Sequence, residues 1–529
     1  MAKQRQRLGD ILPGLLSAST ILTILCLAIL SLWFFADNQI DLDFLSNPEL
    51  WRVFRFTVWQ ALLSALLAIG FALILAKACY PLQFLGKRLL LRLYAVTFVL
   101  PTLVLIIGLP QVYGRQGWLA TVWMWFGFDY TFSIYGLSGI LIAHLFYNLP
   151  FAFRLFYQSL DSIAIEQRQL SAQLGLSYWQ RFRYLEWPVL NRQLLPTFAL
   201  VFMLCFTSFA IVLTLGGGPQ NTSFEVAIYQ ALRDFEIGQA VILSFIQLLF
   251  CVSFMLLLRR LASPVAPISI SNHRQFREFN HPAARWMSAV ITVIASLFIL
   301  SPMLAVIVNG IKAFSLALLT SALLKSTITS LLIAIGSACF ALLLTLSLLW
   351  TTSRLQFSGR YRLSDLLMLS GSLILAIPGM VLAAGFFLLF YGLHDSALMI
   401  GGLMIISNGL MALPFTLKTL ENPVNDLTHR YTLLAQSLNI QGKNYFYWIE
   451  FKALKSIFLF AFAFACVMSI GDFGMISLFG SQDFATLPFY LYQQLGAYRN
   501  QAADFTALVL LVLCFGIFYL IERWANKYD

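Results

Sequence analysis

Charged residues are scarce in this sequence, and their scarcity excludes most soluble folds. Only 11% of the 529 residues are Asp, Glu, Lys or Arg, while 60% are hydrophobic, and the mean hydropathy is +0.81. A soluble domain carries about 25% charged residues. The composition therefore predicts an all-α polytopic membrane protein embedded in the lipid bilayer.

Residues that perform chemistry are also missing. Gly86-Lys87 and Gly442-Lys443 lack the upstream glycine and the following Ser or Thr of a phosphate-binding loop. The sequence shows no cluster of acids, bases or metal ligands, and its seven cysteines are scattered, mostly inside apolar runs. We therefore predict no enzymatic activity, no catalytic residue, no metal and no cofactor.

Twelve apolar runs are long enough to cross a bilayer, which takes about 20 mostly apolar residues. They lie at approximately 14–35, 56–77, 91–111, 134–156, 194–215, 239–258, 287–310, 327–350, 366–390, 396–416, 455–479 and 504–522. The first run is too long for a signal peptide and lacks a clear cleavage site, so we expect a helix there. The Trp-rich segment 118–128 is too short to span and is expected at the outer interface.

The distribution of Lys and Arg predicts the orientation. With the N-terminus inside, seven of the 34 Lys and Arg residues fall on or near the outer side, which leaves 27 at the inner side. Positive residues favour the cytoplasm, so both termini are expected there. The net charge of +11 has the same origin and does not indicate a nucleic-acid partner.

Residues 157–193 form a polar, amphipathic segment between two apolar runs, which we call bracket 1. Residues 163–174 have helical spacing, and Gly175 suits a left-handed C-cap. Ser177 can cap a second short helix, and Pro188 is expected to end that helix. The pattern predicts two short helices joined by a bend at the glycine.

The same segment recurs 264 positions later, at residues 418–454, which we call bracket 2. Gly175 corresponds to Asn439, the non-glycine residue that best tolerates a left-handed backbone, and Glu186 corresponds to Glu450. Because 264 is close to half of 529, we interpret the chain as a tandem duplication. The predicted parts are a first transmembrane domain (1–258), a cytoplasmic linker (259–285) and a second transmembrane domain (286–529), as two parallel six-helix repeats.

A few polar residues inside the apolar runs are candidates for a transport pathway. A charge at mid-bilayer costs about 2.5–3.5 kcal/mol, so Asp472 should face a cavity or a partner. It either lines the pathway or packs within the helix bundle. His144 and Asn148, one turn apart, either line the pathway or satisfy a proline-kinked backbone. Ser208 is a further candidate for the pathway.

The brackets also have two interpretations. A cytoplasmic amphipathic segment can lie on the membrane surface, or it can dock into a groove on another protein. Exposed aromatic residues such as Tyr178 and Trp179, and the occurrence of the bracket in both halves, favour docking.

Both brackets resemble the cytoplasmic signature of binding-protein-dependent ABC importer permeases. That signature reads Glu-Ala-Ala, three residues, Gly, nine residues, Ile, one residue, Leu-Pro. By resemblance, the residues that dock an ATPase in bracket 1 are Gln169, Leu170, Ser171, Gly175, Leu185 and Pro188. In bracket 2 they are Leu433, Leu434, Ala435, Asn439 and Ile449, with Lys452 in place of the proline.

Within that family the chain is similar to the thiamine permeases of Gram-negative bacteria. The strings that carry this resemblance are 112–121, 166–170, 216–219, 469–474 and 486–494. The resemblance implies two fused transmembrane domains that work by alternating access, a dimeric cytoplasmic ATP-binding subunit, and a periplasmic binding protein that delivers thiamine or its phosphate esters. Two alternatives remain open: a permease of this family for another small solute, such as ferric iron, and an ion-coupled secondary transporter.

Overall fold

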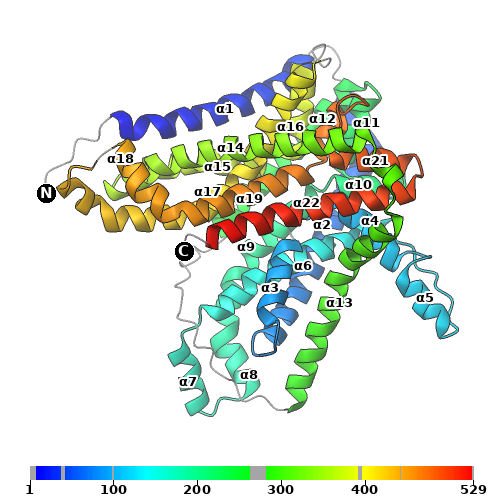
Figure 1. Ribbon diagram of the computed structural model, residues 1–529, viewed down its shortest axis with the longest axis horizontal. Coiled ribbons are helices and arrows are strands. Elements are labelled where there is room, and N and C mark those ends of the chain that lie inside the picture. The colour runs from blue at the N-terminus through cyan, green and yellow to red at the C-terminus, as the bar shows by residue number, and fades with distance from the viewer. Residues whose placement is uncertain are drawn as a thin grey trace.

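The computed structural model describes residues 8–36, 42–97, 100–261, 282–390, 396–440 and 442–526 (Figure 1). These residues form helices and no strands, which confirms the all-α class. The helices are α1 (Leu8–Ala36), α2 (Pro48–Cys79), α3 (Lys87–Thr97), α4 (Thr102–Tyr113), α5 (Trp118–Trp125), α6 (Leu137–Asp161), α7 (Ile165–Gln173), α8 (Tyr178–Arg181), α9 (Trp187–Phe206), α10 (Ala210–Leu215), α11 (Phe224–Arg233), α12 (Ile237–Leu261), α13 (Pro282–Ala313), α14 (Ser321–Phe357), α15 (Tyr361–Ser372), α16 (Gly379–Leu389), α17 (Ala397–Ser437), α18 (Lys443–Tyr445), α19 (Lys452–Gly471), α20 (Gly474–Phe479), α21 (Leu487–Gly496) and α22 (Asn500–Asn526).

Short helical turns connect several of these helices. Two of them, η2 (Phe182–Glu186) and η6 (Phe446–Phe451), are π-helical. Four are 3-10 turns: η1 (Leu42–Ser46), η3 (Pro219–Asn221), η4 (Leu316–Leu318) and η5 (Leu373–Ala376). Most of the predicted linker, residues 262–281, lies outside the described residues.

Ten helical segments in the described part of the chain are long and apolar enough to cross a membrane. A further span consists of residues 361–376 and 379–389, two helical pieces that bend by 89° at their junction. The expected span at 91–111 is not one helix but two, α3 and α4, on either side of Pro101. The expected number of twelve is therefore approximate, because the predicted spans at 91–111 and 366–390 do not form single straight helices.

The two interruptions occur at prolines that the repeat makes equivalent. Pro101 occupies the N-cap of α4, and Pro378 occupies the N-cap of α16. Proline has no backbone N–H and disfavours helical geometry in the residue before it, so a long apolar run breaks there. The same break in both halves leaves a short helix, α4 or α16, beside the centre of the molecule.

The first helix of each half packs against the other half. Helix α1 contacts α14, α15 and α16, whereas α13 contacts α2, α4 and α22. Gly108 in α4 and Gly385 in α16 permit this approach, because a Cβ atom at either position would collide with the backbone of Pro302 or of Ala28. The Ser31 hydroxyl donates to the Gly385 carbonyl at 2.6 Å. The halves are thus interlocked rather than merely adjacent.

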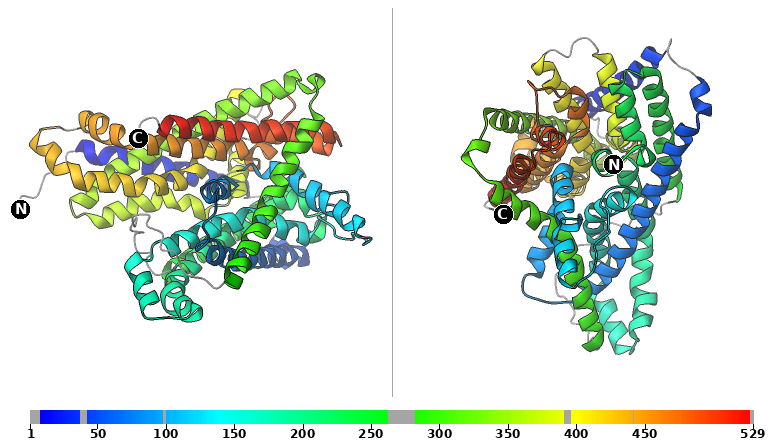
Figure 2. Two further views of the ribbon diagram at one scale, coloured as in Figure 1. Left: turned by 60° about the horizontal axis from the view of Figure 1, so that its bottom comes forward. Right: turned by 90° about the vertical axis from the view of Figure 1, so that its right-hand side faces the viewer.

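The helices form two groups that meet at one end and diverge toward the two brackets. Figure 1 shows α14, α15, α17 and α19 running toward α18, while α6 and α9 run toward α7 and α8. Figure 2 shows the same divergence from two other directions. The short helix α5 projects from the end where the groups meet, and its Trp123 and Trp125 are exposed.

Candidate functional site

Bracket 1 contains the two short helices and the bend that the sequence predicts. Helix α7 ends at Gln173, and Gly175 then has a left-handed backbone with a φ of +65°. The Ser177 hydroxyl accepts a hydrogen bond from the backbone N–H of Gln180, whose side-chain oxygen accepts one from the N–H of Ser177. This reciprocal capping box starts α8 and fixes the direction of the chain after the bend.

The expectation that Pro188 ends the second helix is wrong. The helical backbone continues from Tyr178 through η2 into α9, and Pro188 lies in the first turn of α9. The π-helical turn shifts the hydrogen-bonding register there, and a proline is tolerated in the first turn of a helix because its missing N–H has no necessary partner. Bracket 1 is therefore continuous with the helix that leads back toward the centre.

Bracket 2 repeats this arrangement after its own bend. Asn439 has a left-handed backbone with a φ of +55°, as its correspondence with Gly175 predicts. Helix α18, the π-helical turn η6 and helix α19 then follow in order. Lys452 is the first residue of α19 and corresponds at the offset of 264 to Pro188, which is the second residue of α9.

The predicted docking residues have matching burial in the two brackets. Leu170 and Leu434 are exposed, Ser171 and Ala435 are buried, and Leu185 and Ile449 are half-buried. The remaining candidates, which are all exposed, are Gln169, Gly175, Pro188, Leu433 and Asn439. Each bracket thus presents an apolar surface beside its bend. Its role in docking stays a prediction.

Each bracket is joined to a long helix of its own half by a buried ion pair. Lys77, near the end of α2, pairs with Glu186, and Arg354, near the end of α14, pairs with Glu450 at 3.3 Å. Both glutamates are buried. A buried carboxylate is tolerated when an opposite charge and hydrogen bonds compensate for its desolvation. The pairs hold the π-helical turns in place against the helix bundle.

A cavity of about 330 Å³ lies where the two halves meet. Its walls come from α4, α6 and the α9–α10 junction of the first half, and from α16, α17 and the α19–α20 junction of the second. All four candidate pathway residues line it: His144, Asn148, Ser208 and Asp472. The structure therefore brings together residues that are up to 328 positions apart in the sequence (144 to 472), although it does not test their role.

The polar groups of the cavity are held in fixed orientations. Nδ1 of His144 is 2.9 Å from the Ser64 hydroxyl, and the Asn148 amide donates to the His144 carbonyl at 3.0 Å. Asn408, which corresponds to His144 in the repeat, donates to the Ser469 hydroxyl at 3.0 Å. Asp472 lies between α19 and α20, and Ser208 lies at the equivalent junction between α9 and α10.

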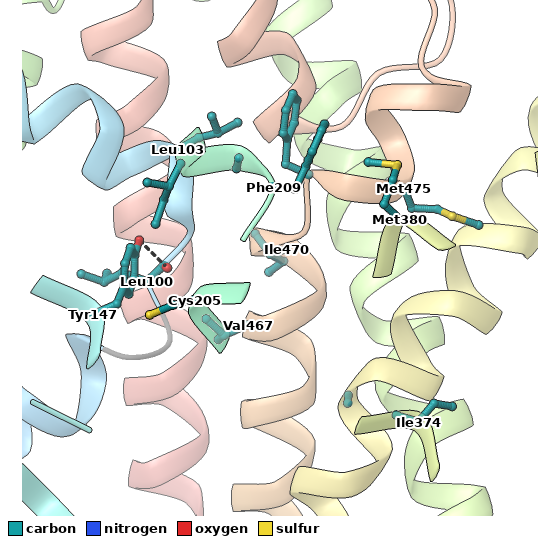
Figure 3. Packing of buried hydrophobic residues seen from close by; sticks show 14 of the residues in the cluster. Leu100, Leu103, Tyr147, Cys205, Phe209, Ile374, Met380, Val467, Ile470 and Met475 are labelled. Carbon is teal, nitrogen blue, oxygen red and sulfur yellow. Dashed lines mark hydrogen bonds between the residues drawn. The ribbon is translucent and has the colours of Figure 1, made fainter. Parts of the chain in front are cut away.

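Aromatic and aliphatic side chains complete the cavity. The rings of Phe209 and Phe473, which are 264 positions apart, stack with centroids 5.7 Å apart and an interplanar angle of 18°. Tyr229 and Tyr492 pack against them at 5.3 and 4.9 Å. Figure 3 shows Phe209 close to Met380 and Met475 of the second half, and the Tyr147 hydroxyl directed at the Leu100 carbonyl.

Sequence reasoning missed several of these residues. Lys77 and Arg354 are 277 positions apart, the same offset as Pro101 and Pro378, so the repeat could have identified the two cations. Glu225 lines the cavity and is 1% exposed. An offset of 263 relates Tyr229 to Tyr492 in this part of the chain. At that offset Glu225 corresponds to Pro488, so the repeat does not mark Glu225 as a recurring polar residue.

The chain is similar to known transport proteins. Residues 68–266 match the family described as binding-protein-dependent transport system inner membrane component. Over its full length the chain is 47% identical to thiamine transport system permease proteins of Salmonella typhimurium and Escherichia coli, and the alignments cover 99% of each. It is 43% identical to the corresponding protein of Haemophilus influenzae over 92% of this chain and 90% of that protein. The similarity extends through both brackets and the cavity.

Proposed function

Since the chain belongs to the family of binding-protein-dependent inner membrane transport components, together with the thiamine transport system permease proteins, we propose that it is the permease of a thiamine importer. The full-length similarity to those permeases carries the substrate part of this proposal. The permease moves thiamine across the inner membrane, and a separate subunit hydrolyses the ATP.

Each bracket is the docking element for one subunit of a dimeric cytoplasmic ATPase. Two features support this assignment: the apolar surface of each bracket, which includes Leu170 and Leu434, and the buried ion pair behind it. An apolar helix face that projects from a rigid support suits insertion into a groove on a partner. A periplasmic binding protein delivers the substrate to the opposite face.

The cavity lies on the transport pathway in this proposal. The diverging helix groups place the brackets apart (Figure 1), and Phe209 and Phe473 line the cavity where the two halves meet. Closure of the ATPase dimer draws the brackets together, and α9 and α19, which continue directly from the π-helical turns, transmit that motion. Transport requires that substrate affinity differ between the outward and inward conformations.

The N- and C-termini and both brackets face the cytoplasm. Single cysteines introduced into a cysteine-free background test this orientation. Labels at Gly217 and Gln482 should react with an impermeant reagent added outside intact spheroplasts. Labels at Gln180 and Asn444 should react only after lysis, and the reverse pattern would contradict the orientation.

Reconstitution tests the function itself. The permease, its ATPase subunit and the periplasmic binding protein are combined in proteoliposomes, and uptake of labelled thiamine is followed with and without ATP. We expect uptake that requires both ATP and the binding protein. Uptake driven by an ion gradient without ATP would instead favour a secondary transporter, and ATP-dependent uptake of a different solute would reassign the substrate.

A further inference from the structure

We propose that the cavity between the halves is itself a substrate site that binds an aromatic cation, with Asp472 as the charge partner and Phe209 and Phe473 as the aromatic wall. This inference rests on the proposed function and deepens it. Thiamine carries a positively charged thiazolium ring linked to an aminopyrimidine ring, so the substrate has the chemistry that the cavity recognises.

The size and position of the cavity suit a small molecule. Its volume of about 330 Å³ is at the lower end of the ~300–1,000 Å³ that is typical of ligand sites. Both halves contribute to its walls. A substrate bound here would therefore contact both halves, whose relative movement changes the site.

Asp472 is oriented toward a ligand by its own backbone surroundings. It is the residue after the last turn of α19, and the backbone N–H groups of Gly474 and Met475 donate to its carboxylate. These bonds fix the side chain at the start of α20. Its Oδ2 atom is buried and has no hydrogen-bond partner among the described residues. One carboxylate oxygen is thus left for a cation in the cavity.

His144 supplies a second unused polar atom. Its Nδ1 is occupied by the Ser64 hydroxyl, whereas its Nε2 has no hydrogen-bond partner in the described part of the chain. The side chain is 1% exposed and lines the cavity. A buried polar atom without a partner is destabilising unless a ligand or water satisfies it. The aminopyrimidine ring of the substrate offers both donors and acceptors for this position.

Glu225 is chemically different from Asp472 although it lines the same cavity. Its Oε1 accepts a hydrogen bond from the Gln247 amide at 2.9 Å, and its Oε2 accepts one from the backbone N–H of Met380 at 3.1 Å. Burial raises the pKa of this carboxyl to about 8, and these two hydrogen bonds only partly oppose the effect. Both oxygens of Glu225 are thus already engaged, so this residue links the two halves rather than attracting the cation.

The stacked rings of Phe209 and Phe473 favour a flat, cationic ligand. Both rings line the cavity, and their near-parallel arrangement presents aromatic surface from each half. A cation near an aromatic face is attracted by the ring quadrupole, and the attraction grows when water is excluded. The thiazolium ring combines a delocalised charge with a flat face.

The charge of the lining also predicts a preference among substrates. No Lys or Arg is present among the described residues that line the cavity. A phosphate ester of thiamine adds negative charge, which would lie near Asp472 without a basic group to compensate for it. The site should therefore bind thiamine more tightly than thiamine monophosphate.

Direct binding to the permease–ATPase complex tests the proposal. The full chain is placed in nanodiscs with its ATPase subunit, without the binding protein, and binding of labelled thiamine is measured by equilibrium dialysis. We expect Asp472→Asn to weaken thiamine binding by about tenfold or more, because one contact to a charged group is lost. The variant should also lose most of the preference for thiamine over thiamine monophosphate.

A second variant moves the charge without removing it. Ser208 corresponds to Asp472 in the repeat, so the double variant Ser208→Asp/Asp472→Ser places the carboxylate at the equivalent junction of the first half. We expect this variant to recover part of the preference for the cation, which a purely structural role of Asp472 would not allow. Co-purification of the ATPase subunit with each variant checks that the fold is retained.

The possible outcomes separate this inference from the proposed function. A wild-type complex that transports thiamine in proteoliposomes but binds none without the binding protein would overturn the inference alone. Unchanged affinity and unchanged preference in Asp472→Asn would also overturn it. A complex that transports no thiamine at all would overturn the proposed function instead.

Discussion

The two brackets have the same arrangement, but the helices that lead into them differ. In the first half, α6 ends at Asp161 and α7 begins at Ile165, so the chain breaks before the bracket helix. In the second half, α17 runs without a break from Ala397 to Ser437. From the bend onward the halves agree: each has a left-handed residue at the bend, then a π-helical turn that contains a buried glutamate.

One pair of corresponding residues accounts for part of the difference. The Arg168 guanidinium donates to the Leu160 carbonyl at 2.6 Å, near the end of α6, where the helical hydrogen bonds stop. The same guanidinium lies over the Tyr80 ring. Thr432, at the corresponding position, donates to the Thr428 carbonyl one turn earlier in the unbroken helix α17. The approach to the bracket therefore varies between the halves, whereas the segment from the bend to the glutamate has the same form in both.

The largest expected effect comes from removing a glutamate of an ion pair. Glu186→Gln and Glu450→Gln each leave a half-buried cation without its partner charge, at a cost below the about 3–5 kcal/mol of a fully buried pair. We expect the loss of uptake to be greater for Glu186→Gln. Both cations keep a contact with an aromatic ring, Lys77 with Tyr178 and Arg354 with Trp350, but Arg354 also keeps a hydrogen bond to the Trp350 carbonyl at 2.8 Å.

Uptake and co-purification of the ATPase subunit measure this difference between the brackets. The charge-swapped variant Lys77→Glu/Glu186→Lys is the control, since it keeps one charge of each sign at the site. Equal and small effects of the two Gln variants would show that the ion pairs do not hold the brackets.

A smaller effect is expected at the bend itself. Gly175→Val forces a β-branched residue into a left-handed backbone, which costs about 1–2 kcal/mol. A Cβ atom at Gly175 would meet no other atom within 4 Å, so the cost comes from the backbone alone. We expect reduced ATPase recruitment with normal membrane insertion. Gly175→Asn, which copies bracket 2, is the matched control and should be milder; equal behaviour of the two variants would contradict this account.

Pro188 and Lys452, which correspond in the repeat, should respond differently to substitution. The backbone N–H of Lys452 donates to the Ile449 carbonyl, so Lys452→Pro removes a hydrogen bond of about 1 kcal/mol. Pro188→Ala removes no such bond, because proline has no N–H, and should be nearly neutral. Thermal unfolding of the purified variants compares them. If Pro188→Ala were destabilised and Lys452→Pro were not, the backbone N–H at these positions would not account for the difference.

The smallest effect is expected for Asn439→Gly. Glycine adopts the left-handed backbone more easily than asparagine does, although it is more flexible in the unfolded chain, so the two contributions nearly cancel. Uptake should stay within about twofold of the wild type. A severe loss would show that the Asn439 side chain, and not its backbone conformation, is what bracket 2 requires.

The repeat made much of this architecture predictable. The offset of 264 identified Gly175 and Asn439 as positions for a left-handed backbone, and both have positive φ angles. Pro101 and Pro378 are 277 positions apart, an offset that relates them in the repeat, but the sequence did not predict that the apolar runs would break there. The prediction that Pro188 ends a helix was wrong because a π-helical turn has no distinct signature in hydrophobic periodicity.

The cavity was predictable only in part. His144, Asn148, Ser208 and Asp472 stood out because polar residues are rare in apolar helices. Their meeting around one cavity depends on how the halves interlock, which no local pattern encodes. Glu225 escaped notice because its helix, α11, is short and amphipathic, and a glutamate is unremarkable in such a segment. Its burial arises only from contacts with α12 and α16.

The interlocked first helices also constrain how the protein is made. The carbonyl that accepts the Ser31 hydrogen bond belongs to Gly385, 354 residues later in the chain. At a synthesis rate of ~5–20 residues per second, α1 waits roughly 20–70 s in the membrane before its partners α14–α16 emerge from the ribosome. During that interval it can contact α12 of its own half, as Trp33 contacts Phe245 in the folded protein, but none of its partners in the second half. The joining of the first helix to the second half is therefore a late step of biogenesis, and a single fused chain guarantees that this half is always supplied.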